Sequence, residues 1–278
     1  MGVFAYLILL GGIWKDAVPV FARAENISDM FDDSADNTWM FAGGTETQGR
    51  YEEVKGRRNF VGDIEESIRK GGSGGAPEHQ RYTINVGKAG RDLAGFLEEM
   101  DDYVARLDPK AVSYMIEEED YGKGVSGVAA FQENLSLLIQ KGLSMKEDGG
   151  YVVIQLPHAV AGDKNADAGR YAEAARETVE TFTDDRDRIR IVDHYAKTNS
   201  SSFFNGGNLT ETGRLNGTGH FLIAEQFCRD VAGVWNNTSP VTKNWEETEG
   251  PRNYLPIQPI VTASSESLTV SLPKEFDS

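Results

Sequence analysis

The stretch WMFAGGTETQGR, residues 39–50, decides how this chain folds. Apolar residues run into two glycines and then a polar turn, a pattern typical of a buried strand that ends in a tight loop. The stretch has the shape of a strand leading into a catalytic turn. It contains no serine or cysteine, so Thr45 is the residue at the place where a nucleophile would stand.

Apolar runs and amphipathic helical patterns alternate along the rest of the chain. Five strands that alternate with helices predict a parallel sheet covered on both faces, because right-handed crossovers place the helices there. The fold class is therefore α/β, with three layers (α/β/α) around a five-stranded parallel sheet of the flavodoxin-like kind. Its ligand site is expected at the carboxyl ends of the strands. The expected strands are 38–44, 81–87, 110–116, 150–157 and 188–195, and the expected helices are 57–70, 91–107, 127–143, 166–182 and 216–235, the last with Asn216 as its N-cap.

Four short blocks follow these strands in order: GGTETQG at 43–49, NVGKAG at 85–90, EEED at 117–120 and ETGRLNGTGH at 211–220. Together they make residues 39–234 resemble the SGNH hydrolases, also called the GDSL esterase/lipase family. The family's blocks are Gly-Asp-Ser-x-Thr-x-Gly, Asn-x-Gly-x-x-Gly, Gly-x-Asn-Asp and Asp-x-x-His. The resemblance implies the SGNH fold.

The resemblance also implies where the family's catalytic groups would lie. Thr45 stands at the position of the serine nucleophile, Glu119 at that of the oxyanion-binding asparagine, Glu211 at that of the aspartate and Arg214 at that of the histidine base. Of these functional positions only Gly90, whose N–H would bind the oxyanion, keeps the family's residue.

These replacements oppose hydrolysis. Arginine stays protonated and supplies no base, and Glu119 places an acceptor where a donor should stabilise negative charge. The sequence therefore predicts a divergent pseudoenzyme with no catalytic residues. Thr45, Glu119, Glu211 and Arg214 are expected to form a ligand-binding site instead, in which Arg214 pairs with Glu119 or Glu211.

Two other functions stay open. One is an active carbohydrate O-acetylesterase or related acylhydrolase, with Thr45 as nucleophile and His220 or His158 as the base; for His220, His158 and His194 a structural role is the favoured interpretation. The other is a structural spacer between surface domains.

Composition excludes some classes of partner. The net charge of −16 and pI of about 4.7 argue against nucleic acid, which attracts clustered Lys and Arg. No His/Cys cluster has metal-ligand spacing, so neither a metal nor a cofactor is expected. The carboxylates of 117–120 could bind a hard cation, but an acidic loop is usually solvated. The single cysteine, Cys228, is expected to be a buried thiol.

The two ends of the chain differ from the middle. Residues 1–24 hold an apolar run of signal-peptide length that ends in FARA, too short to span a bilayer. Residues 25–235 form the SGNH-like domain, and 236–278 read as a linker and the start, or remnant, of a β domain. We therefore expect a binding or scaffolding module of an exported multidomain bacterial protein, extracellular or at the cell surface and not an integral membrane protein. By family analogy its partner is a glycan or another cell-surface component, on which four aromatic residues near the site could stack: Tyr51, Tyr121, Phe203 and Phe204.

Overall fold

The computed structural model describes residues 37–49, 59–70, 81–147, 149–210, 212–233, 235, 260–263 and 268–271. The apolar segment 1–24, Tyr51 and Glu211 lie outside the described residues, as does most of the segment 236–278. The expectations for those residues stay predictions.

A five-stranded, all-parallel sheet forms the centre of the protein, in the order β2-β1-β3-β4-β5. This confirms the predicted sheet. The chain starts in β1, adds β2 on one side and then the other strands on the opposite side, so the strand order reverses between β1 and β3. Ligand sites of open α/β sheets lie at such reversal points, outside the carboxyl ends of the strands. The strands are β1 (Asn37–Ala42), β2 (Arg81–Asn85), β3 (Ala111–Met115), β4 (Tyr151–Gln155) and β5 (Ile189–Val192).

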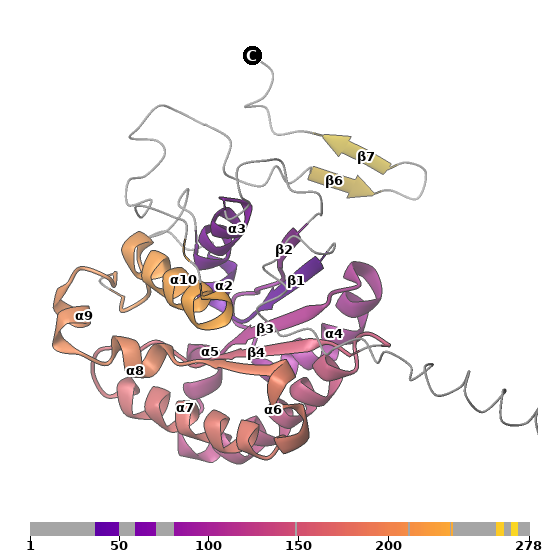
Figure 1. Ribbon diagram of the computed structural model, residues 1–278. Helices are drawn as coiled ribbons and strands as arrows, with labels where there is room; N and C mark the ends of the chain where they lie inside the picture. Colours follow the sequence, from indigo (N-terminus) through magenta and orange to yellow (C-terminus); the bar gives the residue numbers. More distant parts are fainter. Residues whose placement is uncertain are drawn as a thin grey trace, which may run out of the picture.

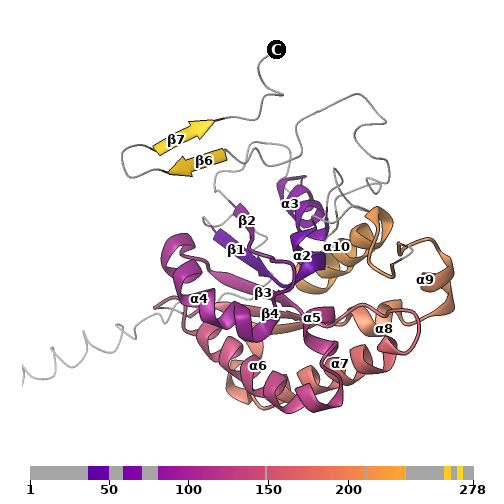
Figure 2. The ribbon, with the colours of Figure 1, turned by 180° about the vertical axis from the view of Figure 1, so that it is seen from behind.

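Helices cover both faces of the sheet (Figure 1 and, from behind, Figure 2). On one face α3 (Phe60–Lys70) packs beside α10 (Gly217–Ala232), and their apolar side chains form a core cluster with Trp39 and Phe41 of β1. On the other face lie α4 (Leu93–Leu107), α6 (Val128–Leu143) and α7 (Lys164–Glu180), which enclose a second cluster. Every residue of β3 and β4 is buried, because both faces of a central parallel strand are covered.

One-turn helices at the strand ends were not predicted. They are α2 (Thr45–Gln48), α5 (Glu118–Tyr121), α8 (His194–Thr198) and, after α8, α9 (Ser201–Asn205). The 3₁₀ turns Val125–Gly127, before α6, and Thr183–Arg188, before β5, were not predicted either. A single turn is too short to show a 3.6-residue apolar period. The expected fifth strand was too long, because the start of the one-turn helix α8 was taken as its continuation. β5 ends at Val192, and the Asp193 side chain caps α8 by accepting the N–H of Ala196.

The predicted cap of the last helix is confirmed. The Asn216 side chain accepts hydrogen bonds from the backbone N–H groups of Thr218 and Gly219, at 3.0 and 3.1 Å. In the C-terminal part, Ile260–Ala263 (β6) and Leu268–Ser271 (β7) pair as antiparallel strands, in line with the alternating pattern there. No helix within the described ranges is long and apolar enough to cross a membrane.

Candidate functional site

The site lies where the strand order reverses. β1 ends at Ala42 and leads through Gly43 and Gly44 into the single turn of α2, while β3, its neighbour in the sheet, leads into the acidic loop 116–121. Because these strands are parallel and adjacent, their following loops meet at one edge of the sheet. The sequence blocks 43–49 and 117–120 are thus brought together, as the resemblance implied.

The four carboxylates of 117–120 point to four different places. Glu118 forms an ion pair with Lys164 of α7. Asp120 accepts hydrogen bonds from the N–H of Leu93 at 2.8 Å and the hydroxyl of Tyr114 at 3.0 Å, and burial raises the pKa of its carboxyl to about 7. Within the described ranges, no three His, Cys, Asp or Glu side chains are grouped as ligands for a metal ion.

Glu117 holds α2 in place. Its buried carboxylate accepts hydrogen bonds from the N–H groups of Gly44 (3.0 Å), Glu46 (2.5 Å) and Thr47 (2.9 Å), and from the Thr47 hydroxyl (2.6 Å). Burial, with the charges of Glu119 and Glu46, raises the pKa of Glu117 to about 8, although the bonds from Thr47 act in the opposite direction. These contacts satisfy the unpaired N–H groups at the start of a short helix.

The carboxylate of Glu119 fills the place that the resemblance assigns to an oxyanion. Its Oε1 accepts hydrogen bonds from the Thr45 N–H at 3.1 Å, from the Thr45 hydroxyl, and from the Gly90 N–H at 3.2 Å. We call Thr45, Gly90 and Glu119 the plugged cradle. The N–H groups of Thr45 and Gly90, which would stabilise a developing negative charge, already bind the carboxylate of Glu119.

Gly44 provides the space for this carboxylate. A Cβ atom built on Gly44 would lie 2.5 Å from Glu119 Oε2 and 2.6 Å from its Cδ. Oε2 itself is buried and has no hydrogen-bond partner among the described residues. Gly44 stands where the family's first block has aspartate. Because residue 44 has no side chain, the Glu119 carboxylate can occupy the space beside it.

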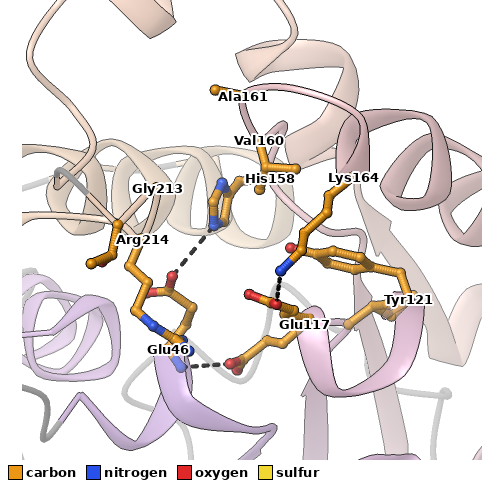
Figure 3. Close-up of a pocket in the computed structure, with 12 residues that line it drawn as sticks. Glu46, Glu117, Tyr121, His158, Val160, Ala161, Lys164, Gly213 and Arg214 are labelled. Carbon is orange, nitrogen blue, oxygen red and sulfur yellow. Dashed lines mark hydrogen bonds and ion pairs between the residues drawn. The ribbon is translucent and has the colours of Figure 1, made fainter. Parts of the chain in front are cut away.

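Arg214, at the position of the family's histidine, lines a separate small pocket with a volume of about 70 Å³. Figure 3 shows its side chain beside Glu46 and directed toward Glu117. Thr45 and Glu119 do not line this pocket, so Arg214 and the plugged cradle belong to different parts of the site. Whether Arg214 pairs with Glu119 or Glu211 stays a prediction. The lining residues are Glu46, Ile116, Glu117, Glu118, Tyr121, His158, Val160, Ala161, Lys164, Thr212, Gly213 and Arg214.

Glu46 is the centre of a buried group that the sequence did not reveal. Its Oε1 accepts the Leu215 N–H at 3.1 Å and lies 3.5 Å from His158 Nε2, and its Oε2 lies 3.7 Å from His220 Nε2 (Figure 3 shows the contact with His158). We call Glu46, His158 and His220 the glutamate–histidine cluster. Glu46 occupies the variable position after Thr45 in the first block, and only the turn of α2 directs it away from the cradle.

The ring nitrogens of the three buried histidines contact groups other than Thr45. Both ring nitrogens of His220 are engaged, Nδ1 by the Phe60 N–H and Nε2 by Glu46. His158 places its nitrogens on the Ala159 carbonyl and Glu46. His194 lies between the side chains of two glutamines. Burial lowers the pKa of His194 and of His220 to about 4.

Other predicted residues are also placed by the structure. Tyr121 lines the pocket, whereas Phe203 is buried against the core and Phe204 packs at the edge of the same cluster. Cys228 is buried as expected, and burial raises the pKa of its thiol to about 12.

Comparison with known proteins agrees on the fold. No protein-family model and no curated protein matches the sequence. Among solved structures, LAE5, an alpha/beta hydrolase enzyme from the metagenome of Lake Arreo, superimposes with a TM-score of 0.58 and 14% identity, over 75% of this chain and all of that one. Axe2, an acetylxylan esterase from Geobacillus stearothermophilus, gives 0.57 and 14%, over 73% of this chain and 97% of that one.

A lipase/acylhydrolase from Enterococcus faecalis gives a TM-score of 0.56 and 17% identity, over 73% of this chain and 99% of that one. At such low identity these likenesses establish the fold. The protein has the α/β fold of the SGNH hydrolases, and the expectation from the four sequence blocks is confirmed at that level.

Proposed function

We propose that this protein is a non-catalytic domain of the SGNH hydrolase fold, which binds a ligand or organises neighbouring domains rather than hydrolysing an ester. One observation carries the proposal: the Glu119 carboxylate is bound to the hydroxyl and N–H of Thr45 and to the N–H of Gly90.

This contact opposes ester hydrolysis electrostatically. An oxyanion in the cradle would have to displace the carboxylate of Glu119 or lie against it, and two negative charges at that distance repel. Loss of one oxyanion donor costs roughly 10²–10³ in rate, and here two backbone donors are engaged. Glu119 could accept the Thr45 proton, but the same oxygen fills the cradle, so it cannot serve both steps.

The identity of the ligand is a further part of the proposal. Structural neighbours include enzymes described as acetylxylan esterases, and Tyr121 with several charged side chains lines the pocket. These features support a glycan or another cell-surface component as the partner. The apolar N-terminal segment supports an exported module of a larger bacterial protein.

Hydrolysis assays test the proposal directly. We would incubate the protein, beside its Thr45→Ala variant, with an aryl acetate and with acetylated xylooligosaccharides, and measure acetate release. The expected result is the same background rate for both proteins. Activity in the native protein that disappears in Thr45→Ala would overturn the proposal and establish an esterase with Thr45 as its nucleophile.

Binding is tested separately, because inactivity alone does not identify a ligand. The same two proteins would be screened on a glycan array and by calorimetry against the best candidates. Binding that is reduced by Arg214→Ala, with the fold intact by circular dichroism, supports the proposed pocket. No binding to any glycan would leave the inactive domain in place and remove the glycan as its partner.

A further inference from the structure

Glu46 connects three segments that are far apart in the sequence. It projects from α2 to the backbone of Leu215 in the loop before α10, to His158 in the loop after β4, and to His220 within α10. The loop after β4 and the loop before α10, which carries Arg214, line the small pocket. The side chains of Glu46, His158 and His220 are all at least nine-tenths buried, so the hydrogen atoms in their contacts must be accounted for.

The contacts of His158 favour an additional proton between its ring and Glu46. Its Nδ1 lies 2.9 Å from the carbonyl oxygen of Ala159, which can only accept, so Nδ1 carries hydrogen. A neutral ring would then present the lone pair of Nε2 to Glu46 Oε1, an oxygen that already accepts the Leu215 N–H. A lone pair facing a carboxylate in the protein interior is unfavourable. One more proton, on the imidazole or on the carboxyl, resolves the conflict.

His220 does not supply that proton. The Phe60 N–H donates to its Nδ1 at 3.4 Å, so Nδ1 is unprotonated and the ring is neutral, with hydrogen on Nε2 facing Glu46 Oε2. The low pKa of His220 agrees with this assignment, since burial disfavours its charged form. The cluster therefore has one neutral histidine and one histidine that shares a proton with the carboxyl group.

We propose that Glu46 and His158 share a buried proton, and that this proton latches the loop carrying Arg214 and the loop carrying His158 onto α2. Glu46 is a positioning residue in this arrangement, because it acts through the backbone of Leu215. Other titratable and charged groups facing the pair come from the surrounding elements: Glu117, Tyr121, His194, Arg214, His220, and Lys164 with Glu118.

The sign of the pH dependence follows from the contacts. The latched state holds the shared proton, and the state with separated loops exposes Glu46 and His158 to water and releases it. Raising the pH therefore favours release, and the latch is lost as the shared proton dissociates. Protonation of Glu117 or His220 does not replace it, because neither lies between His158 Nε2 and Glu46 Oε1.

Nuclear magnetic resonance of the native protein provides the first test. We would label histidine with ¹⁵N and record the imidazole signals from about pH 5 to about pH 9, the range in which histidine usually exchanges its proton. His158 should show two protonated nitrogens at the acid end and lose one proton in a single step. His220 should remain the neutral form with hydrogen on Nε2. A His158 that is neutral throughout would overturn the proposal.

Amide hydrogen exchange at Leu215 provides the second readout, corrected for the intrinsic effect of pH on exchange. In the native protein the protection of this amide should fall by at least about tenfold as His158 loses its proton. In Glu46→Gln the protection should be low at every pH, because an amide offers one oxygen where the carboxylate accepts on both. Glu98→Gln, a change of an exposed glutamate on α4, is the matched control and should behave as the native protein does.

Two results would contradict the latch even if Glu46→Gln failed to fold. One is Leu215 protection in the native protein that does not change with the state of His158. The other is native-like, pH-dependent protection in His158→Gln, which lacks the titrating ring. Both outcomes are independent of ester hydrolysis, so they leave the proposed function to its own assay.

Discussion

Thr45 and Glu46 are neighbours on one turn of helix, yet they face two different environments. Thr45 lies in the plugged cradle, where Glu119 occupies the donors of Thr45 and the N–H of Gly90 in the loop after β2. Glu46 points into the glutamate–histidine cluster, where a carboxylate joins three distant segments. The comparison teaches that the position assigned by the resemblance to the nucleophile holds a partly exposed contact, whereas the variable position beside it holds a buried one.

The largest expected effect on stability is therefore at Glu46. Glu46→Ala removes a buried acceptor that contacts the Leu215 N–H, His158 Nε2 and His220 Nε2, so the free energy of unfolding should fall by about 3–5 kcal/mol. Urea unfolding measures it. Thr45→Ala is the comparison variant and should cost about 1 kcal/mol or less. Equal losses in the two variants would remove the distinction between the two regions.

A second test examines the packing under the plugged cradle. Gly44→Ala places a Cβ against Glu119 Oε2, and overpacking of this kind costs about 1–3 kcal/mol. The cost should shrink in the double variant Gly44→Ala/Glu119→Ala, since the obstructing carboxylate is gone. A double-mutant cycle from urea unfolding gives the coupling between the positions. Strict additivity would mean that Glu119 does not lie over Gly44.

The third test uses acid. The pKa of buried His220 is about 4, below the value of about 6.5 for an unfolded chain, so the unfolded state takes up a proton that the folded state refuses. The contribution of His220 to stability is complete above about pH 6.5 and falls as the pH decreases toward 4, by roughly 1.4 kcal/mol per pH unit for each such histidine.

Urea unfolding across that range measures the slope. In His220→Gln the slope should be smaller than in the native protein, while the contribution of His194, also with a pKa of about 4, remains. An unchanged slope would show that His220 is not held neutral by burial.

The smallest expected effect concerns charge alone. Glu119→Gln keeps an oxygen for the donors of Thr45 and Gly90 but removes the charge that helps to raise the pKa of Glu117. The Glu117 carboxyl, followed by ¹³C resonance, should then titrate below its native value of about 8. Stability should change by less than about 1 kcal/mol. An unchanged pKa of Glu117 would show that the charge of Glu119 has little effect on the Glu117 carboxyl, although both lie in one loop.

Part of this arrangement could be predicted from the sequence. The five strands are continuous apolar runs, and the strand-end blocks placed Thr45, Gly90 and Glu119 together because parallel strands end at one edge. That Glu119 would oppose an oxyanion followed from its chemistry. The sequence could not show that the Glu119 carboxylate binds both backbone donors. This depends on the path of its side chain, which the space beside Gly44 determines.

The glutamate–histidine cluster could not be predicted in the same way. Glu46 and His158 meet only because one turn of helix rotates Glu46 away from the cradle, and because the loop after β4 brings His158 inward. One-turn helices leave no apolar period, and a single glutamate in a variable position resembles a solvated residue. Their burial was the only distinguishing signal, and burial depends on the completed fold.

The space above Gly44 also sets the order in which this site could be engineered into a hydrolase. An aspartate introduced at position 44, as in the family's first block, would meet the Glu119 carboxylate before any other change took effect. Replacement of Glu119 must therefore precede it, and a nucleophile at position 45 gains a usable oxyanion site only afterwards. The glycine thus imposes epistasis on the mutational route: the two substitutions are tolerated when Glu119 is replaced first and blocked when Gly44 is replaced first.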